Sequence, residues 1–387
     1  MASTSRRSWA GLSKLAKPFI GAKATRKMQR MERPNTLWFV LGGSLVVWAV
    51  AGRWLLLPFF GASNLSEPNE RRGGSSRRIK RPDGTELQVE FFGPEGAPTL
   101  VLTHGWEQNS TGWYYLKRDL AKRFRLIVWD LPGFGESSRP SNGDYSVEKM
   151  ASDLAAVVEL AGRPVVLVGH GLGGMVMQTY CRLYPQHLGT RVTGMVLMDT
   201  TYTDPLKTAR FSPLWQALRT PVIVPACYVS IALSPLVRIL GWLNYYSGSS
   251  HLIRRFVGFA GRQTWRQVDF IARLSAEASP TVAAHVSLAT LHFDEWETLP
   301  KISIPVLILA GETDRVTRID VNRQIQQRIP GAKLKTFRPG GHYSLYEHHD
   351  AFSQAVAEFV DHHKNYAAAS SGIEQGSEKP AVVAGRF

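Results

Sequence analysis

Pro-Val-Val-Leu-Val-Gly-His-Gly-Leu-Gly-Gly occupies residues 164–174, where an apolar run ends abruptly in a cluster of glycines. Residues 165–168 are apolar, mostly β-branched and of strand length, which indicates a buried strand. Residues 172–184 carry apolar side chains at helical spacing. Residues 169–171 are therefore expected to form a tight turn from a strand into a helix.

Two different chemistries use such a turn. In the nucleophile elbow, Gly-x-Ser-x-Gly, a strained turn holds a serine hydroxyl above the edge of the sheet. Gly169, His170, Gly171 and Gly173 occupy that turn here, with Gly171 in the serine position. The dinucleotide fingerprint Gly-x-Gly-x-x-Gly is matched literally by Gly169, Gly171 and Gly174. The turn by itself leaves both interpretations open.

Composition and charge narrow the class of protein. The chain has 387 residues and is 44% hydrophobic, which excludes a disordered protein and allows a sizeable core. Its formal net charge of +15 is uneven, because residues 1–35 hold nine basic and one acidic residue while residues 82–387 hold 30 and 28. The near-neutral main part predicts no nucleic-acid partner. The two cysteines exclude a disulfide framework.

The N-terminal region predicts a membrane anchor. Residues 1–35 form a basic segment. Residues 36–61 are mostly apolar and carry no charge apart from Arg53, and this stretch is long enough to cross the hydrocarbon core. Six basic residues in the range 17–33 against three in the range 71–77 favour a cytoplasmic N-terminus. We expect a single-pass membrane protein that has the lipid bilayer as a partner and its main domain on the other side. The alternative is an interfacial or re-entrant helix.

The main domain predicts an α/β fold. Residues 62–77 have linker composition, and ordered structure is expected from residue 78 with a hairpin around Pro82-Asp83-Gly84. Strands and helices then alternate, which predicts a mostly parallel sheet with helices on both faces. The expected strands are 99–103, 125–130, 165–168, 194–198, 306–310 and 333–337, and the expected helices are 146–161, 172–184, 320–328 and 350–363.

Residues 202–298 break this alternation before the last two strands and predict a helical cap with proline breaks at Pro221, Pro225 and Pro235. The α/β core is then 78–201 and 299–363, and residues 364–387 are expected to be a disordered tail. Residues 204–273 hold nine basic and two acidic residues among many apolar ones. Such a cap fits contact with an anionic lipid surface. It fits an ordinary cap core with a solvated charged rim equally well.

Motifs rich in glycine and polar residues follow the predicted strands, at the carboxyl ends where ligands bind in parallel α/β sheets. In chain order they are His104-Gly105-Trp106, Asp130-Leu131-Pro132-Gly133-Phe134-Gly135-Glu136-Ser137, Gly169–Gly174, Asp199, Gly311-Glu312-Thr313-Asp314 and Gly340-Gly341-His342. An ordered set of this kind is more specific than any one of its motifs.

This order resembles the α/β-hydrolase superfamily, in particular its capped esterase, lipase and carbon–carbon hydrolase branches, over roughly residues 85–363. The resemblance implies that Asp314 is the triad acid, that His342 is the general base, and that the backbone N–H groups of Trp106 and Leu172 form the oxyanion hole. It also implies hydrolysis of a small ester or lipid-like acyl substrate, with no cofactor and no metal. Asp199 is the alternative acid if Asp314 points away.

The dinucleotide-binding oxidoreductase becomes the weaker alternative, because it explains neither His104-Gly105 nor Gly341-His342. The sister families with an aspartate nucleophile, epoxide hydrolases and haloalkane dehalogenases, require Asp where Gly171 stands.

The missing nucleophile leaves three hypotheses, because Gly171 has no side chain with which to form an acyl-enzyme. The chain is a serine-hydrolase scaffold whose serine was replaced, or a pseudo-hydrolase that binds an apolar ligand beneath the cap. In the third hypothesis, the space above Gly171 holds a water that His342 activates directly.

Overall fold

The computed structural model describes residues 22–60, 68 and 72–374, with side chains described for residues 37–59, 68 and 72–363. The chain divides into two compact units at the Val50–Ala51 boundary. The first holds most of the long helix α1 (Ala22–Leu56), and the second holds the α/β core and everything inserted in it.

An eight-stranded sheet forms the centre of the second unit, in the order β1-β2-β4-β3-β5-β6-β7-β8. The first two strands form the expected antiparallel hairpin, β2 pairs antiparallel with β4, and the remaining neighbours are parallel, which confirms the mostly parallel sheet. The strands are β1 Ser75–Lys80, β2 Glu86–Phe92, β3 Thr99–Thr103, β4 Arg125–Trp129, β5 Val165–His170, β6 Val192–Met198, β7 Val306–Gly311 and β8 Lys333–Phe337.

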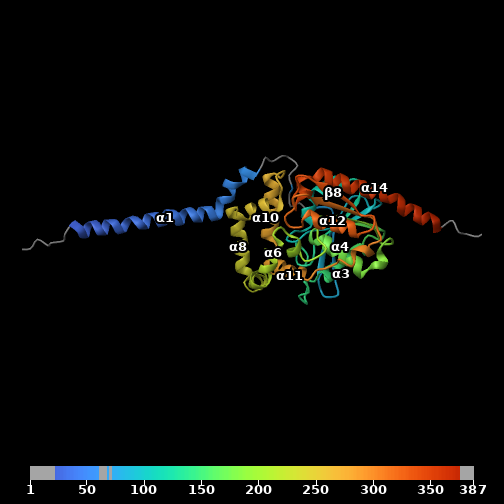
Figure 1. Cartoon of the computed structure of the whole chain (residues 1–387), viewed down its shortest axis with the longest axis horizontal. Coiled ribbons are helices and arrows are strands. Elements are labelled where there is room, and N and C mark those ends of the chain that lie inside the picture. The colour runs from blue at the N-terminus through green and yellow to red at the C-terminus, as the bar shows by residue number, and fades with distance from the viewer. Residues whose placement is uncertain (1–21, 61–67, 69–71, 375–387) are drawn as a thin grey trace, which may run out of the picture. The chain divides into compact units, whose positions relative to one another are not determined.

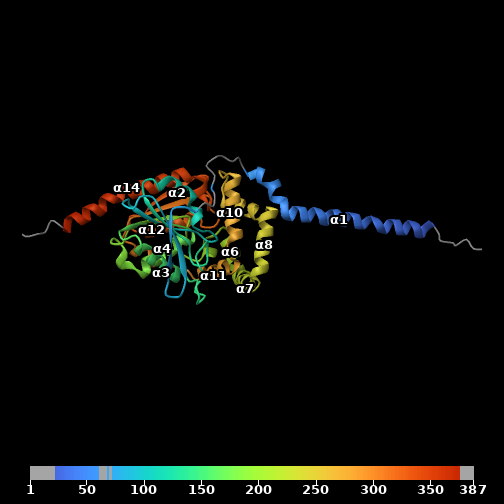
Figure 2. The same cartoon turned by 180° about the vertical axis from the view of Figure 1, so that it is seen from behind.

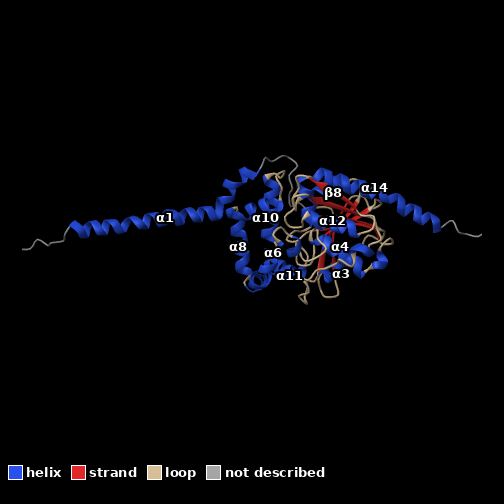
Figure 3. Ribbon diagram, in the orientation of Figure 1, coloured by secondary structure: helices blue, strands red, loops and turns tan. Residues whose placement is uncertain are grey.

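Helices cover both faces of this sheet (Figure 3). Alternate residues of one strand point to opposite faces, and β3 shows the result: Val101 packs in one core cluster, whereas Leu100 and Leu102 pack in the other. The Val101 cluster includes side chains from α3, α4 and α12, and the other includes side chains from α2 and α14. These helices are α2 Tyr114–Leu120, α3 Val147–Glu159, α4 Leu172–Leu183, α12 Ile319–Arg328, the short α13 Ser344–Glu347, and α14 His349–Glu374.

A helical insertion separates β6 from β7, and its helices gather beside the α/β core (Figures 1 and 2). Pro235 lies in the first turn of α8, after the 105° bend that separates α8 from the preceding helix, and its missing N–H costs no helical hydrogen bond there. The breaks predicted at Pro221 and Pro225 are absent, because Ser212–Ala232 runs on as one helix that takes up both prolines. Pro221 lies in its π-helical turn, Arg219–Ile223. The helices are α5 Pro205–Thr208, α6 Ser212–Leu218, α7 Val224–Ala232, α8 Ser234–Ser247, α9 Ser249–Gly258, α10 Trp265–Glu277 and α11 Pro280–Thr290.

The N-terminal helix contains one segment, Leu37–Phe59, that is long and apolar enough to cross a membrane by length and composition. Helix α1 begins at Ala22, inside the predicted basic segment, and a short 3-10 turn, Leu57–Phe60, follows it. Residues 1–21 of the basic segment lie outside the described residues.

The structure moves several predicted boundaries. Strand β5 continues to His170, so of the turn predicted at residues 169–171 only Gly171 lies outside the strand. Strand β1 begins at Ser75, inside the segment predicted to be a linker, because it takes its backbone hydrogen bonds from β2 and needs no apolar pattern of its own. Helix α14 continues to Glu374, beyond the predicted start of a disordered tail, through alanines that favour helix. Residues 62–67 and 69–71 of the linker and residues 375–387 of the tail lie outside the described residues.

Candidate functional site

The predicted site residues meet at the carboxyl ends of the central strands. Thr103 at the end of β3 pairs with Gly169 of β5, and His170 pairs with Met198 of β6, so the turns after these strands lie side by side. A pocket of about 300 Å³ opens beside these turns and is closed on its other side by the helical insertion. The residues that line it include Trp106, His170, Gly171, Leu172, Met175 and His342 from the core and Pro205, Arg254, Val257 and Thr290 from the insertion.

His342 and Asp314 form a hydrogen-bonded pair. Nδ1 of His342 lies 3.0 Å from Oδ2 of Asp314, and the Asp314 carboxylate is buried. The other carboxylate oxygen accepts hydrogen bonds from the backbone N–H groups of Val316 (2.6 Å) and Thr317 (3.0 Å). These donors stabilise the ionised carboxylate and fix its direction. The pair therefore has the imidazole orientation that general-base chemistry requires, with Nε2 left facing the pocket.

Thr317 is a site residue that sequence analysis missed. Its hydroxyl donates to Oδ2 of Asp314 at 2.6 Å and lies 3.4 Å from Nδ1 of His342. It therefore holds the same carboxylate oxygen that faces the imidazole. Its place three residues after Asp314 in a loop gives no periodic signal.

Gly171 forms the turn between β5 and α4, with φ +52° and ψ −111°. The turn is held from both sides, because its N–H donates to the Met198 carbonyl at 3.0 Å and its carbonyl accepts from the Thr200 hydroxyl at 2.7 Å. A β-carbon built on Gly171 would lie 3.7 Å from Nε2 of His342 and would clash with nothing. The backbone thus makes a sharp turn from strand to helix, and the space beside Gly171 is open.

The glycines on either side of this turn, Gly169 in β5 and Gly173 and Gly174 in α4, have a packing role. A β-carbon on Gly173 would overlap the Thr103 carbonyl oxygen, and one on Gly174 would lie 2.5 Å from the Thr200 hydroxyl oxygen. A β-carbon on Gly169 would overlap the Met177 sulfur. Helix α4 can approach β3 and β6 this closely because these positions lack side chains. Packing thus accounts for Gly169 and Gly174 of the Gly-x-Gly-x-x-Gly spacing, and the positive φ of the turn accounts for Gly171.

Two backbone N–H groups border the pocket at the predicted oxyanion positions. Leu172 is the first residue of α4, where N–H groups lack intrahelical acceptors. Neither its amide nor that of Trp106 donates to another group in the described part of the chain. His104 shapes the Trp106 turn: its Nε2 accepts from the Leu131 N–H at 3.0 Å, so Nδ1 carries the proton and donates to the Gly105 carbonyl at 2.8 Å.

His170 packs behind the pair and is buried. Burial, reinforced by the neighbouring His342, lowers the pKa of His170 to about 3, so its ring is neutral at physiological pH. Its Nε2 donates to the His342 carbonyl oxygen at 3.0 Å. His170 thus fixes the backbone of His342.

Asp199 does not pair with His342. Its carboxylate accepts from the Gly311 N–H at 2.8 Å and from the Ser344 hydroxyl at 2.5 Å. Burial, together with the nearby Asp314, raises the pKa of Asp199 well above its usual range. Because Asp314 faces the imidazole, the alternative acid is not needed, and Asp199 ties the ends of β6 and β7 to the segment after His342.

A partly buried ion pair between the insertion and the core was also missed. Nη2 of Arg254, in α9, donates to Oε2 of Glu107 at 2.5 Å, and the guanidinium also shares a hydrogen bond with the Tyr343 hydroxyl. On the other side of the same turn, the Trp106 indole N–H donates to the Ala283 carbonyl of α11 at 3.2 Å. The turn that carries the Trp106 amide is therefore held by two helices of the insertion.

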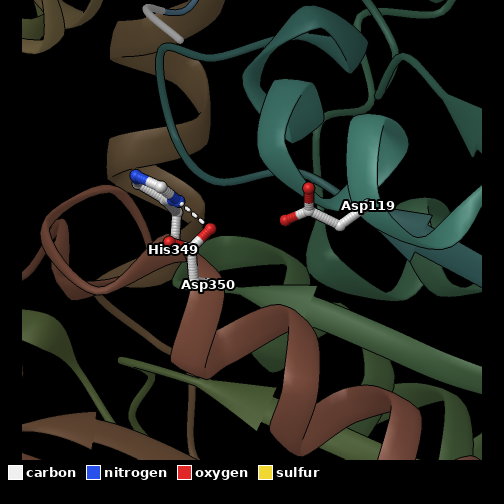
Figure 4. A group of neighbouring side chains, drawn as sticks. All are labelled: Asp119, His349 and Asp350. Carbon is white, nitrogen blue, oxygen red and sulfur yellow. Dashed lines mark hydrogen bonds and ion pairs between the residues drawn. The ribbon is translucent and has the colours of Figure 1, made fainter. Parts of the chain in front are cut away.

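Asp119, His349 and Asp350 bring possible metal ligands together away from this pocket (Figure 4). Arg118 already binds this group, since its guanidinium contacts Asp119 at 2.5 Å and Asp350 at 3.0 Å. Asp350 is also 81% exposed, so its carboxylate is well solvated. The cluster is an arginine-centred ion-pair network that fastens α2 to the start of α14.

Known proteins share this architecture. The sequence profile of the family described as "alpha/beta hydrolase fold" matches residues 98–349. The AB hydrolase superfamily protein YisY of Bacillus subtilis is 28% identical over 284 residues, which cover 73% of this chain and 97% of that protein. The 2-hydroxy-6-oxononadienedioate/2-hydroxy-6-oxononatrienedioate hydrolase of Burkholderia vietnamiensis is 27% identical over 288 residues, or 72% of this chain and 92% of that protein.

Solved structures agree on the fold. An esterase from Exiguobacterium antarcticum superposes with a TM-score of 0.60 at 23% identity, and the match covers 75% of this chain and all of that one. The enol-lactonase from Burkholderia xenovorans superposes with a TM-score of 0.57 at 20% identity over 74% of this chain and all of that one. The chain therefore belongs to the α/β-hydrolase fold family.

Proposed function

We propose that the pocket binds carboxylic esters or lipid-like acyl substrates and hydrolyses them slowly, with His342 acting on a water that occupies the space above Gly171. The observation that carries this proposal is the open position at Gly171, 3.7 Å from Nε2 of His342 when measured from a β-carbon built there. A family member with serine would place its hydroxyl in that space. In this chain the same space is free and faces an imidazole that Asp314 orients.

The reaction uses each group for one task. His342 Nε2 takes a proton from the water, and the resulting hydroxide adds to the ester carbonyl carbon. The Trp106 and Leu172 N–H groups stabilise the negative charge that forms on the carbonyl oxygen, an effect worth about 3 kcal/mol per donor in mutational tests. As the C–O bond breaks, the imidazolium returns the proton to the leaving alkoxide, so that one ester and one water give one acid and one alcohol. Asp314 stabilises the imidazolium between these steps.

The substrate class follows from the pocket and the N-terminal helix. Most of the lining is apolar, including Trp106, Leu172, Met175 and Val257, which favours acyl chains over polar substrates. Residues 36–61 are proposed to anchor the chain in a lipid bilayer as a single-pass helix, with the N-terminus cytoplasmic and the hydrolase domain on the other side.

A paired assay tests the proposal. The native chain and its His342→Ala variant are assayed with p-nitrophenyl esters of short and long acyl chains. Turnover in the native chain that vanishes in the variant supports water activation by His342. Turnover that survives in His342→Ala, or native turnover no faster than buffer, contradicts it.

A second candidate is a pseudo-hydrolase that binds an apolar ligand without cleaving it, and the absence of any side chain at Gly171 favours it. It predicts no turnover in either form together with saturable binding of a non-hydrolysable acyl ether. The dinucleotide-binding alternative does not fit, because the glycine turn follows β5 and its glycines are explained by the packing of α4 and by the positive φ of Gly171.

A further inference from the structure

Helix α8 carries an apolar stripe on its exposed side. The side chains at i, i+3, i+4 and i+7 share one face of a helix, and on this face of α8 they are 38% to 58% exposed: Leu236, Ile239, Leu240, Leu243 and, one turn on, Tyr246. A water-facing helix face normally carries polar residues. This stripe is therefore too large and too regular to be scattered surface leucines.

The stripe continues over the neighbouring helices. No residue is buried in α6, in the π-helical turn or in α7. Four of their apolar side chains are at least half exposed: Leu214, Val222, Tyr228 and Val229. The segments Ser212–Ala232 and Ser234–Ser247, bent by 105° at their junction, are together apolar enough to pass as a broken membrane segment. This part of the insertion has the composition of a surface that meets lipid.

Helix α9 carries exposed apolar side chains and also contributes to the lining of the pocket. On α9, Ile253, Phe256 and Val257 form a second exposed apolar group at helical spacing, and each is at least 46% exposed. Val257 also lines the pocket beside Arg254 and Gly258. Val257 therefore connects the exposed apolar group of α9 with the lining of the pocket.

The end of the N-terminal helix is built into this insertion. Arg53 contacts Asp269 of α10 at 3.6 Å and lies over the rings of Tyr245 (4.5 Å) and Tyr246 (5.3 Å) in α8. Gly248, between α8 and α9, has φ +84°, and a β-carbon there would lie 2.6 Å from the Leu56 side chain. The end of the membrane-spanning candidate is thus docked on the helices that carry the apolar stripe.

Charge complements this apolar surface. Residues 204–273 hold nine basic and two acidic residues, and three of the basic residues are paired with acids: Arg219 with Asp204, Arg254 with Glu107 and Arg273 with Glu277. Within α6–α9, Arg238 is exposed and Arg255 is half-buried. Exposed basic residues near an apolar face attract the headgroups of anionic lipids.

We propose that the exposed faces of α6–α9, which we call the cap face, lie in the headgroup region of an anionic phospholipid bilayer and that apolar substrates enter the pocket from that bilayer past Phe256 and Val257. The membrane contact stands without the proposed hydrolysis. The entry route rests on the proposed function, because it takes the pocket to be the substrate site.

Depth-dependent fluorescence in the full-length protein tests the cap face. An environment-sensitive thiol label is placed at Ile239→Cys, at Phe256→Cys or at the exposed Gln354→Cys of α14, each in a Cys227→Ser background because Cys181 is buried. The protein is reconstituted in phosphatidylcholine and phosphatidylserine vesicles with nitroxide-labelled lipid. We expect lipid quenching at positions 239 and 256 to be several-fold stronger than at 354, and to weaken when phosphatidylserine is omitted.

Position 354 controls for tethering, because a domain held to the membrane by its helix alone would expose all three labels equally. Equal quenching, or strong quenching of labels 239 and 256 by aqueous iodide, overturns the proposal. Protection from both lipid nitroxide and iodide also overturns it, since a second copy of the chain would then cover the cap face. None of these readings depends on turnover, so failure of the proposed hydrolysis leaves the test intact.

Discussion

Gly171 and His342 face each other across an empty gap of side-chain size, 3.7 Å from the built β-carbon to Nε2. This gap predicts that Gly171→Ser restores a serine nucleophile. We expect the variant to hydrolyse acyl esters at least about 10²-fold faster than the native chain, since loss of a catalytic serine in a complete triad costs up to about 10⁶ in kcat. A fluorophosphonate probe should label the variant and leave the native chain unlabelled. Gly171→Ala is the matched control, and labelling of that form would contradict the assignment.

Stability should distinguish the turn glycine from the packing glycines. A side chain at Gly171 would meet open space, but the residue has a positive φ. We therefore expect Gly171→Ser and Gly171→Ala to lower the free energy of unfolding by no more than about 3 kcal/mol. Gly173→Ala introduces a methyl group onto the Thr103 carbonyl and should cost more, because backbone has to move. Thermal melts of the three variants check the order. A Gly171→Ser form with a clearly raised Tm would rule out a strained elbow.

Substitutions in the Asp314 network should lower turnover by graded amounts. Asp314→Asn removes the charge that stabilises the imidazolium and is expected to lower the turnover of the Gly171→Ser form by up to about 10⁴-fold. Thr317→Val removes only the hydroxyl that donates to Oδ2 at 2.6 Å and should cost about tenfold, the equivalent of 1.4 kcal/mol. The kcat values of both variants measure this, with Thr317→Ser expected to recover most of the loss. Full activity in Thr317→Val would show that Asp314 is positioned without it.

His170 predicts a pH dependence of stability. Its pKa is depressed from the usual 6.5 to about 3 in the folded chain, so below about pH 6.5 the unfolded chain binds a proton that the folded chain does not. Folding stability should therefore fall as pH drops from about 6.5 toward 3, by up to about 1.4 kcal/mol per pH unit from this group. His170→Gln keeps a donor for the His342 carbonyl and should flatten that slope in denaturant unfolding series between pH 4 and 6. An unchanged slope would mean that other groups cause it.

Much of the α/β core could be predicted because buried parallel strands are continuous apolar runs. Strands β3 and β8 have the predicted bounds, and the turns that carry His104, Gly171 and His342 follow strands, as the motifs indicated. Helix α2 was missed because it spans only Tyr114–Leu120, and so short a segment shows no clear helical spacing of apolar residues.

The remaining site residues could not be read from the sequence because their roles arise from contacts between distant segments. Arg254 and Glu107 are 147 residues apart, and only the folded insertion brings them together. Arg72 shows the same effect at a predicted boundary: it stands in the linker range, yet its guanidinium contacts Glu90 at 2.7 Å and Asp130 at 3.0 Å. Composition cannot distinguish such an anchored arginine from a solvated one.

The short turn after helix α1 has a practical consequence for producing a water-soluble form of this protein. Leu57 is only 4% exposed and packs in the same core cluster as Leu100 and Phe352, so the last residues of the apolar helix are also part of the folded domain. Starting the expressed chain after Phe60 would remove the core side chain of Leu57 along with the apolar part of helix α1. A cut at Val50 would keep Arg53, Leu56 and Leu57 in place and is the better starting point for expression and crystallisation.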